Sequence, residues 1–193
     1  MTWSELETQC RQCMKCALGA TRTNLVFGGG NPEAEVLFIG EGPGEQEDLK
    51  GEPFVGRSGQ LLDKYLAAIG LDRHENIYIA NMVKCRPPQN RDPKPEEQEE
   101  CIFWLREQLR LMRPKIVVCL GRISAQRLIS PQFRVTLEHG QFFDKAGILF
   151  MGTFHPAALL RNPNNKPDAL EDFLALRGKI RKLCERTYAG HRE

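Results

Sequence analysis

The stretch VLFIGEGPG, residues 36–44, joins four apolar residues to a turn that contains three glycines and a proline. Three similar apolar runs occur further along the chain, at residues 77–81, 116–121 and 148–152. Continuous apolar runs of this length are typical of strands that are buried on both faces of a sheet. These four runs therefore predict the strands of a central sheet.

Helical patterns lie between and after these runs. Residues 59–71 place apolar side chains on one helical face, and residues 94–114 carry a proline and acids in their first turn and a proline at their end. A shorter helix is expected at 121–129 and a long one at 168–188. Strands that alternate with helices favour a parallel sheet. We expect a three-layer α/β/α architecture with a central four-stranded parallel sheet, in a single domain over residues 1–193.

The composition is that of an ordinary globular protein. The chain is 41% hydrophobic, and its net charge of +2 does not by itself indicate a nucleic-acid partner. The N-terminus lacks the basic segment and apolar run of a signal peptide, and no stretch is long enough to span a bilayer. We therefore expect a soluble cytoplasmic protein without membrane contact, and we expect it to be a monomer.

Unusual residues follow three of the predicted strands. In parallel sheets ligands bind beyond the carboxyl ends of the strands, where this sequence places the loop 40–44, Asn81 and His155. A phosphate ligand is disfavoured, because the acids in and after the loop would repel it. An amide offers a donor and an acceptor together, and a histidine can donate to a carbonyl oxygen. The set favours a uracil-like ring, and we interpret Glu45 and Asp48 as solvated surface acids.

The seven cysteines fall into two kinds. Cys10, Cys13 and Cys16 are spaced C-x2-C-x2-C, and Cys85 and Cys101 follow far downstream. In an intracellular chain, grouped cysteines favour a metal site over disulfides, and this spacing alone leaves both zinc and an iron–sulfur cluster open. The two others lie in apolar or helical patterns and are predicted to be buried thiols: Cys119 and Cys184.

Three long motifs resemble those of the uracil-DNA glycosylase superfamily. They are GEGPGEQEDLKGEPFVGRSGQLLD at 40–63, NMVKCRPPQNRDPKPEEQEEC at 81–101 and HPAALLRNP at 155–163. Together with the cysteines, they make the chain similar to family 4, the iron–sulfur type, over residues 13–183. The resemblance implies a monofunctional enzyme that flips uracil out of DNA and hydrolyses its N-glycosidic bond. Such an enzyme leaves an abasic site for base excision repair.

The resemblance also implies roles for individual residues. Phe54 is expected to stack on the uracil ring, Asn81 to read the pyrimidine edge, and His155 to face O2, where the leaving anion gathers charge. From its position directly after the strand end, and not from the resemblance, Glu41 is the first candidate for a carboxylate that stabilises the sugar cation and positions water, and Glu47 is the second. The expected uracil-binding residues are Gly40, Glu41, Gly42, Glu47, Phe54, Asn81 and His155.

Gly42 departs from the best-known branch of the superfamily, which carries an aspartate before the proline of this loop. The departure leaves open an alternative function, a non-catalytic protein that binds uracil-containing or damaged DNA. A third interpretation, a nucleotide-binding α/β protein, is disfavoured by the acids of the loop. One related group in the superfamily bonds covalently to uracil and carries a basic insertion. That insertion is absent from this sequence, so we expect catalytic turnover.

The cofactor implied by the resemblance is a [4Fe–4S] cluster with Cys13, Cys16, Cys85 and Cys101 as ligands. Cys10 lies outside this pattern, although its C-x2-C spacing leaves it as an alternative ligand. The chemistry of the spacing does not choose between cluster and zinc, so the choice rests on the resemblance.

The implied partner is uracil-containing DNA, single- or double-stranded. The resemblance places Leu159, Leu160 and Arg161 on a loop that enters the minor groove. The preference among single strand, U·G and U·A, the activity on other damaged bases and a sliding-clamp partner stay open. A basic patch suited to phosphate contacts is predicted by four residues of the second motif: Lys84, Arg86, Arg91 and Lys94.

Overall fold

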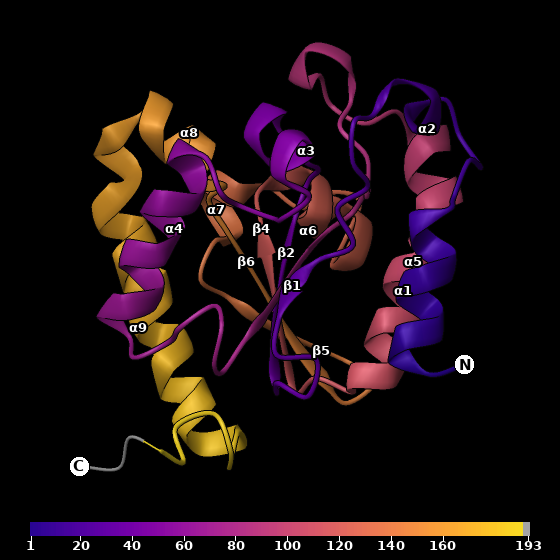
Figure 1. Cartoon of the computed structure of the whole chain (residues 1–193). Helices are drawn as coiled ribbons and strands as arrows, with labels where there is room; N and C mark the ends of the chain where they lie inside the picture. The colour runs from indigo at the N-terminus through magenta and orange to yellow at the C-terminus, as the bar shows by residue number, and fades with distance from the viewer. Residues whose placement is uncertain (191–193) are drawn as a thin grey trace.

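The computed structural model describes residues 1–190 of the chain. Within them, a six-stranded sheet has the order β1-β3-β2-β4-β6-β5 and carries helices on both faces (Figure 1). The four inner strands are parallel to one another, and the two edge strands pair antiparallel. The strands are β1 (Gly29–Gly30), β2 (Val36–Gly40), β3 (Tyr78–Asn81), β4 (Ile116–Leu120), β5 (Phe142–Lys145) and β6 (Ile148–Thr153).

The three layers and the four parallel strands are confirmed, but the prediction of a four-stranded sheet is wrong because two edge strands add to it. β1 consists of two glycines, which have no strand propensity of their own. β5 forms a hairpin with β6 across Ala146 and Gly147, whose φ angles of 53° and 83° are those of a two-residue turn with left-handed backbone. Pairing with a neighbouring strand, rather than sequence pattern, defines both edges.

Alternate residues of the inner strands supply two separate cores. In β2, Val36 and Phe38 pack in the cluster under α4 (Arg57–Ala68) and α9 (Lys166–Leu183), whereas Leu37 and Ile39 pack in the cluster on the opposite face. All five residues of β2 and of β4 are buried. This explains why these strands are continuous apolar runs in the sequence.

The four predicted helices form, although the last one ends at Leu183 and not at residue 188 as expected. Figure 1 shows α4 and α9 on one side of the sheet, and α1 and α5 on the other. The helices are α1 (Trp3–Arg11), α2 (Leu18–Thr21), α3 (Glu45–Lys50), α4 (Arg57–Ala68), α5 (Pro95–Met112), α6 (Arg122–Leu128), α7 (Val135–Glu138), α8 (Pro156–Arg161) and α9 (Lys166–Leu183), with short 3-10 helices at Pro88–Asn90 and Pro163–Asn165.

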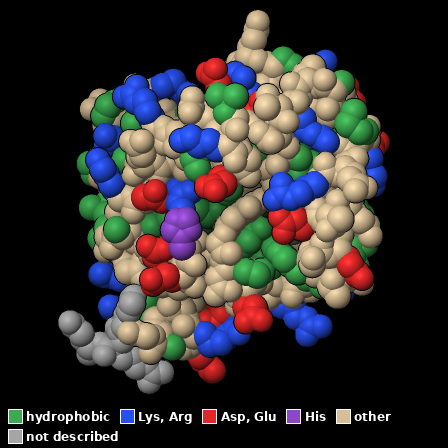
Figure 2. All heavy atoms as spheres, viewed as in Figure 1, with side chains coloured by type: hydrophobic (Ala, Val, Ile, Leu, Met, Phe, Trp, Pro, Cys, Tyr) green, Lys and Arg blue, Asp and Glu red, His purple; other side chains and the backbone are tan. Residues whose placement is uncertain are grey.

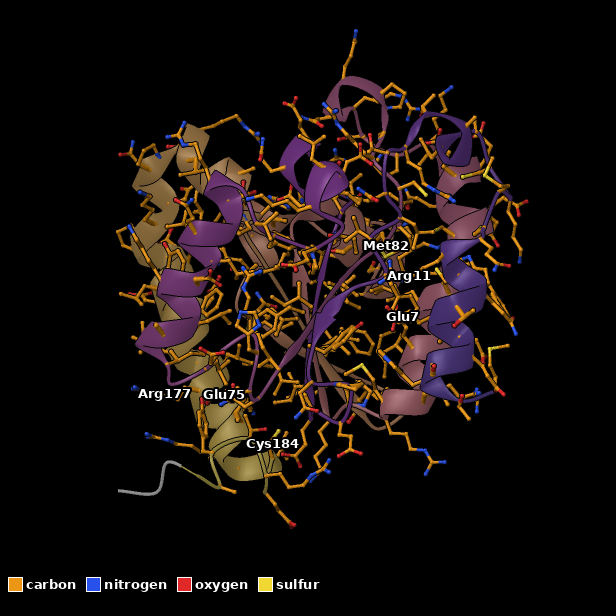
Figure 3. All side chains as sticks on the ribbon, in the orientation of Figure 1. Glu7, Arg11, Glu75, Met82, Arg177 and Cys184 are labelled. Carbon is orange, nitrogen blue, oxygen red and sulfur yellow. The ribbon has the colours of Figure 1, made fainter. Side chains whose placement is uncertain are left out.

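The N-terminal segment packs against the rest of the protein. Leu6 and Cys10 of α1 are buried against α5 and Phe27, in a third apolar cluster that also contains Cys85 and Cys101. The two thiols predicted to be buried are buried, and Figure 3 shows Cys184 just after the end of α9. No helix among residues 1–190 is long and apolar enough to cross a membrane.

Candidate active site

A cleft of about 700 Å³ opens at the carboxyl edge of the sheet. Pockets of this size hold small-molecule ligands in many proteins. Its lining comes from the loops after β2, β3, β4 and β6, which include the three loops predicted to converge and add the loop after β4. The predicted residues that line it are Glu41, Gly42, Glu47, Phe54, Asn81, Arg91, His155 and Arg161.

Gly40 lies beneath this cleft and lets two side chains approach each other. A Cβ atom at Gly40 would lie 2.5 Å from Asn81 Oδ1 and 2.6 Å from Phe54 Cζ, closer than real contacts allow. Asn81 is 2% exposed, and its Oδ1 is the one buried side-chain polar atom in residues 1–190 without a hydrogen-bond partner. A buried acceptor of this kind costs free energy unless a ligand supplies an N–H group.

Phe54 is held in a strained backbone conformation. Its φ of 50° is rare for a bulky residue, and such strain persists where surrounding contacts impose it. Arg73 donates to the carbonyl oxygens of Pro53 and Phe54 at 2.8 and 2.7 Å. Gly59 is required below, because a Cβ there would overlap the carbonyl of Phe54. The ring centroid of Phe54 consequently lies 5.6 Å from that of His155.

His155 caps the N-terminus of α8 with its own ring. Its Nδ1 accepts the main-chain N–H of Ala157 at 3.0 Å, so Nδ1 is unprotonated and the neutral ring carries its proton on Nε2. Burial, aided by the positive charge of Arg161, lowers the pKa of His155 to about 4. Gly121 leaves room for the ring, since its φ is 95° and a Cβ there would lie 2.8 Å from His155 Cβ. The site thus holds a neutral N–H donor.

Glu41 shares the cleft with a second carboxyl group. Burial raises the pKa of Glu41 to about 7, and the charge of Asp92 and a side-chain hydrogen bond to it add to the shift. Arg122 and Arg161 act in the opposite direction. Arg122 Nη2 also lies 2.6 Å from Asp92 Oδ2. A carboxyl group with a pKa near neutrality is typical of a group that works in catalysis.

Glu47 has a different task from Glu41. Its Oε1 accepts the main-chain N–H groups of Val55 and Gly56 at 3.2 and 3.3 Å, which orients the loop that carries Phe54. The two neighbouring acids differ in exposure. Glu45 is exposed as expected, but the prediction of a solvated Asp48 is wrong. Asp48 is buried because its Oδ1 accepts two main-chain N–H groups at residues 23 and 24.

Close packing explains why position 42 is a glycine. A Cβ at Gly42 would lie 2.8 Å from Cγ2 of Val83, in the segment after β3. A longer side chain, such as the aspartate of other superfamily members, therefore requires Val83 to shift. The segment after β3 and the loop after β2 lie closer together here than a side chain at position 42 allows.

Two of the residues expected to contact DNA are in the interior. Lys84 has no exposed surface, and its Nζ donates to Gln108 Oε1 and to the carbonyl of Asn81, so its prediction as a phosphate contact is wrong. Leu159 is 2% exposed and packs in the core, because it lies on the buried side of α8 together with Pro156. It presents no side chain to a groove.

The other predicted basic residues lie at the surface. Arg161 is exposed at the rim of the cleft, and Leu160 beside it is half-buried. Arg86 is half-buried and donates to Asn90 Oδ1 at 2.8 Å, whereas Arg91 is paired with Glu97. Figure 2 shows basic and acidic side chains interspersed on the viewed face rather than separated into one basic surface.

Sequence reasoning missed Asp92 and Arg122 as residues of the cleft. Both line it, and both act on Glu41. A signal was present for Arg122, because it directly follows the glycine that ends the third apolar run, at the same edge of the sheet as the other loops. Asp92 gave no such signal, since it lies in the middle of a polar loop.

The four cysteines expected as ligands line one small cavity beside α2 and α5. Three of their sulfur atoms accept hydrogen bonds of 3.3 Å, from Trp104 Nε1 to Cys13, from the main-chain N–H of Lys84 to Cys101 and from Arg22 to Cys85. Cys10 does not line the cavity, and burial raises the pKa of its thiol to about 12. N–H donors aimed at sulfur suit thiolate ligands.

No group of three or more Cys, His, Asp or Glu side chains in residues 1–190 is arranged to hold a metal ion. The structure therefore shows four neighbouring cysteines in a donor-rich cavity, and not a metal centre. We refer to Cys13, Cys16, Cys85 and Cys101 as the four-cysteine group.

Comparison with known proteins places the chain among relatives. The sequence profile of the Uracil DNA glycosylase superfamily matches residues 27–176. A type-4 uracil-DNA glycosylase of Archaeoglobus fulgidus is 44% identical, with 93% of this chain and 92% of the relative covered. A type-4 uracil-DNA glycosylase of Thermotoga maritima is 42% identical, with 89% and 91% covered.

A more distant relative helps to place the chain within the superfamily. A type-5 uracil-DNA glycosylase of Pyrobaculum aerophilum is 32% identical, with 67% of this chain and 64% of the relative covered. The type-4 relatives match at higher identity and along nearly their whole length. The chain belongs to the uracil-DNA glycosylase superfamily and, within it, to the type-4 enzymes.

Proposed function

We propose that this protein is a monofunctional uracil-DNA glycosylase, which hydrolyses the N-glycosidic bond of deoxyuridine in DNA and leaves an abasic site. The observation that carries this function is the unpartnered Oδ1 of Asn81, buried in a cleft beside an aromatic ring and a neutral histidine. A flipped uracil would supply the missing N–H donor through N3. Among residues 1–190 no lysine lines the cleft, so strand cleavage through an amine nucleophile is not expected.

Recognition begins with extrusion of the base from the DNA stack, which costs a few kcal/mol. In the proposal, stacking on Phe54 offsets part of this cost, at roughly 1–3 kcal/mol for a base on an aromatic ring. Asn81 then pairs with the pyrimidine edge, while the main chain of the loop from Gly40 to Gly42 approaches the ring. The close packing at Gly40 supports this arrangement, because it brings the amide and the phenyl ring together.

Bond cleavage makes the sugar cationic and the uracil anionic, as in other glycoside hydrolyses. The proposed donor to the O2 anion is Nε2–H of His155. Its capping hydrogen bond fixes this tautomer before the substrate binds. A single donor of this kind, placed where charge develops, contributes about 3–4 kcal/mol to transition-state stabilisation.

Glu41 is the proposed catalytic carboxylate. Ionised, it stabilises the developing sugar cation and orients the attacking water. Its raised pKa supports this choice over Glu47, whose carboxylate already accepts two main-chain N–H groups. Glu47 acts in this proposal by holding the uracil-stacking loop.

Arg161 and Arg86 are the proposed DNA contacts, through phosphates next to the flipped nucleotide. The substrate class is uracil-containing DNA, single- or double-stranded. Residues 1–193 are proposed to act as a single domain, as a monomer, in the cytoplasm. A sliding-clamp partner is not needed for the chemistry.

The four-cysteine group is the proposed site of a [4Fe–4S] cluster. The three N–H···S hydrogen bonds and the shared cavity support the fit. Bound there, the cluster would supply structural cross-linking and no step of the hydrolysis. It would join the segment before α2 to the segment from Cys85 to Cys101. The helix α5 begins within this second segment.

The test of function is release of uracil from a labelled oligonucleotide that carries one deoxyuridine, followed by alkaline cleavage of the abasic site. The wild-type protein should release uracil in multiple turnovers. Tight binding of the oligonucleotide without any release would instead favour the alternative function, a non-catalytic protein that binds uracil-containing DNA.

The test of the cofactor is the iron and sulfide content of protein purified without oxygen. About four iron atoms per chain and a broad visible absorbance are expected for the cluster. Stoichiometric zinc instead would assign the group to zinc. The variant Cys101→Ser should lose the metal, and the buried but unligated Cys119→Ser should keep it.

A further inference from the structure

Lys84 is an unusual residue to find in the interior. It has no exposed surface, and none of the ion pairs among residues 1–190 includes it. Its Nζ donates to Gln108 Oε1 at 2.6 Å and to the main-chain oxygen of Asn81 at 3.2 Å, and lies 5.9 Å from the ring centroid of Phe27. A buried lysine held by neutral acceptors is costly, so packing alone is a poor reason for it.

The main chain of the same residue contacts the four-cysteine group. The N–H of Lys84 donates to Sγ of Cys101 at 3.3 Å, and its carbonyl accepts from Val26 at 2.8 Å. Cys85 is its direct neighbour in the chain. Lys84 therefore touches the proposed cluster ligands with its backbone and Asn81 with the end of its side chain.

The segment from Asn81 to Lys84 also holds the loop that contains Glu41. The N–H of Met82 donates to the carbonyl of Gly40 at 3.0 Å, and that of Val83 donates to the carbonyl of Glu41 at 3.1 Å. Figure 3 shows Met82 between the sheet and the helices α1 and α5. The peptide group after Asn81 is thus held on one side by this loop and on the other by Lys84.

We propose that Lys84 is a positioning residue that couples the four-cysteine group to the pyrimidine-reading side chain of Asn81. A displacement of Cys85 or Cys101 moves the backbone of Lys84, and its Nζ carries that displacement to the peptide of Asn81. The inference rests on the roles proposed above for Asn81 and for the four-cysteine group. It assigns Lys84 no contact with DNA.

Binding measurements separate this role from a general structural one. The probe is an oligonucleotide with one 2′-fluoro-2′-deoxyuridine, whose glycosidic bond resists cleavage, and the reference is the same oligonucleotide with a tetrahydrofuran abasic site. Lys84→Met should weaken binding of the uracil probe about tenfold, as expected for the loss of one buried hydrogen bond, and leave the reference unchanged. Equal weakening of both, or of neither, overturns the proposal.

A matched control is Lys145→Met. The Nζ of Lys145 donates to the carbonyls of Leu128 and Ile129 at 3.0 and 2.6 Å, at the end of α6 and outside the cleft lining. This variant loses the same kind of lysine-to-carbonyl hydrogen bond. It should bind both oligonucleotides as the wild type does.

A second measurement uses wild-type protein and does not depend on the folding of any variant. Coupling is reciprocal, so bound uracil should protect the cluster as the cluster supports uracil binding. The uracil probe should slow the loss of visible absorbance in an iron chelator more than the tetrahydrofuran reference does. In Lys84→Met this difference should vanish. Equal protection by both oligonucleotides in the wild type overturns the proposal.

The outcomes distinguish this inference from the proposed function. A wild-type protein that binds both oligonucleotides alike would contradict the proposed role of the cleft. A protein purified without iron would contradict the proposed cofactor. Uracil-selective binding together with iron, but without reciprocal protection, contradicts only the role of Lys84.

Discussion

The cleft and the four-cysteine group lie at the two ends of one five-residue segment, Asn81 to Cys85. They differ in whether their polar atoms have hydrogen-bond partners. In the cleft, the buried Oδ1 of Asn81 has no partner, and the pKa values of Glu41 and His155 are strongly shifted. In the four-cysteine group, three sulfur atoms each accept an N–H donor.

The difference indicates that the cleft, and not the four-cysteine group, is arranged to gain free energy when a ligand binds. Unsatisfied and desolvated groups are costly in the free protein and become favourable when a complementary ligand arrives. Groups with partners already in place support the structure instead. Substitutions in the cleft should therefore change the reaction and spare stability, whereas those at the cysteines should change stability first.

The largest effect is expected from His155→Ala. Loss of the donor to the O2 anion should lower kcat about 10²–10³-fold with little change in Tm. Single-turnover cleavage of a uracil oligonucleotide measures this. The control is His74→Ala, an exposed histidine outside the cleft, which should keep the wild-type rate. A His155→Ala rate within threefold of the wild-type rate would contradict the expectation that substitutions in the cleft change the reaction.

The next effect is expected from Glu41→Gln, with a loss in kcat of about 10²-fold. Because the ionised carboxylate is the active form and burial raises its pKa to about 7, the wild-type rate should rise with pH and reach half of its plateau near pH 7.

The substitution Asp92→Asn sharpens this prediction. It removes a negative charge and a hydrogen bond that both raise the pKa of Glu41. The midpoint of the pH–rate profile should shift toward lower pH, so that the variant becomes faster relative to the wild type below neutrality. A midpoint that stays in place would assign the profile to another group.

A smaller effect is expected from Glu47→Gln. The amide keeps one oxygen but loses the charge that holds two main-chain N–H groups, so the loop of Phe54 should loosen. We expect a KM raised about tenfold, from the weaker acceptance of these hydrogen bonds, with kcat much less affected. A kcat loss as large as that of Glu41→Gln would instead make Glu47 the catalytic carboxylate.

The smallest effect is expected from Arg161→Ala, at the exposed rim of the cleft. If Arg161 contacts a phosphate as proposed, removing its guanidinium should weaken binding a few-fold and reduce the slope of log K against log salt by about one. The control is the exposed Arg181 on α9, whose change to alanine should leave the slope unaltered. Anisotropy titrations at several salt concentrations measure both.

Much of the site was predictable from the sequence, because the carboxyl ends of parallel strands meet at one edge. This rule is enough to bring the loop at Gly40, Asn81 and His155 together. The predictions that went wrong concern single side chains. Asp48, Lys84 and Leu159 are buried, although the first two are charged and all three lie in loops or at helix positions expected at the surface.

The sequence by itself determined the inner strands, since a run that is apolar at every position has to be covered on both faces. It also determined, through its motifs, the family and part of the cleft lining, but not Asp92 and Arg122. Only the tertiary structure decided which carboxyl group has a raised pKa, because the pKa of Glu41 depends on burial and on Asp92. It alone decided where Lys84 points, because that depends on acceptors from Asn81 and from α5.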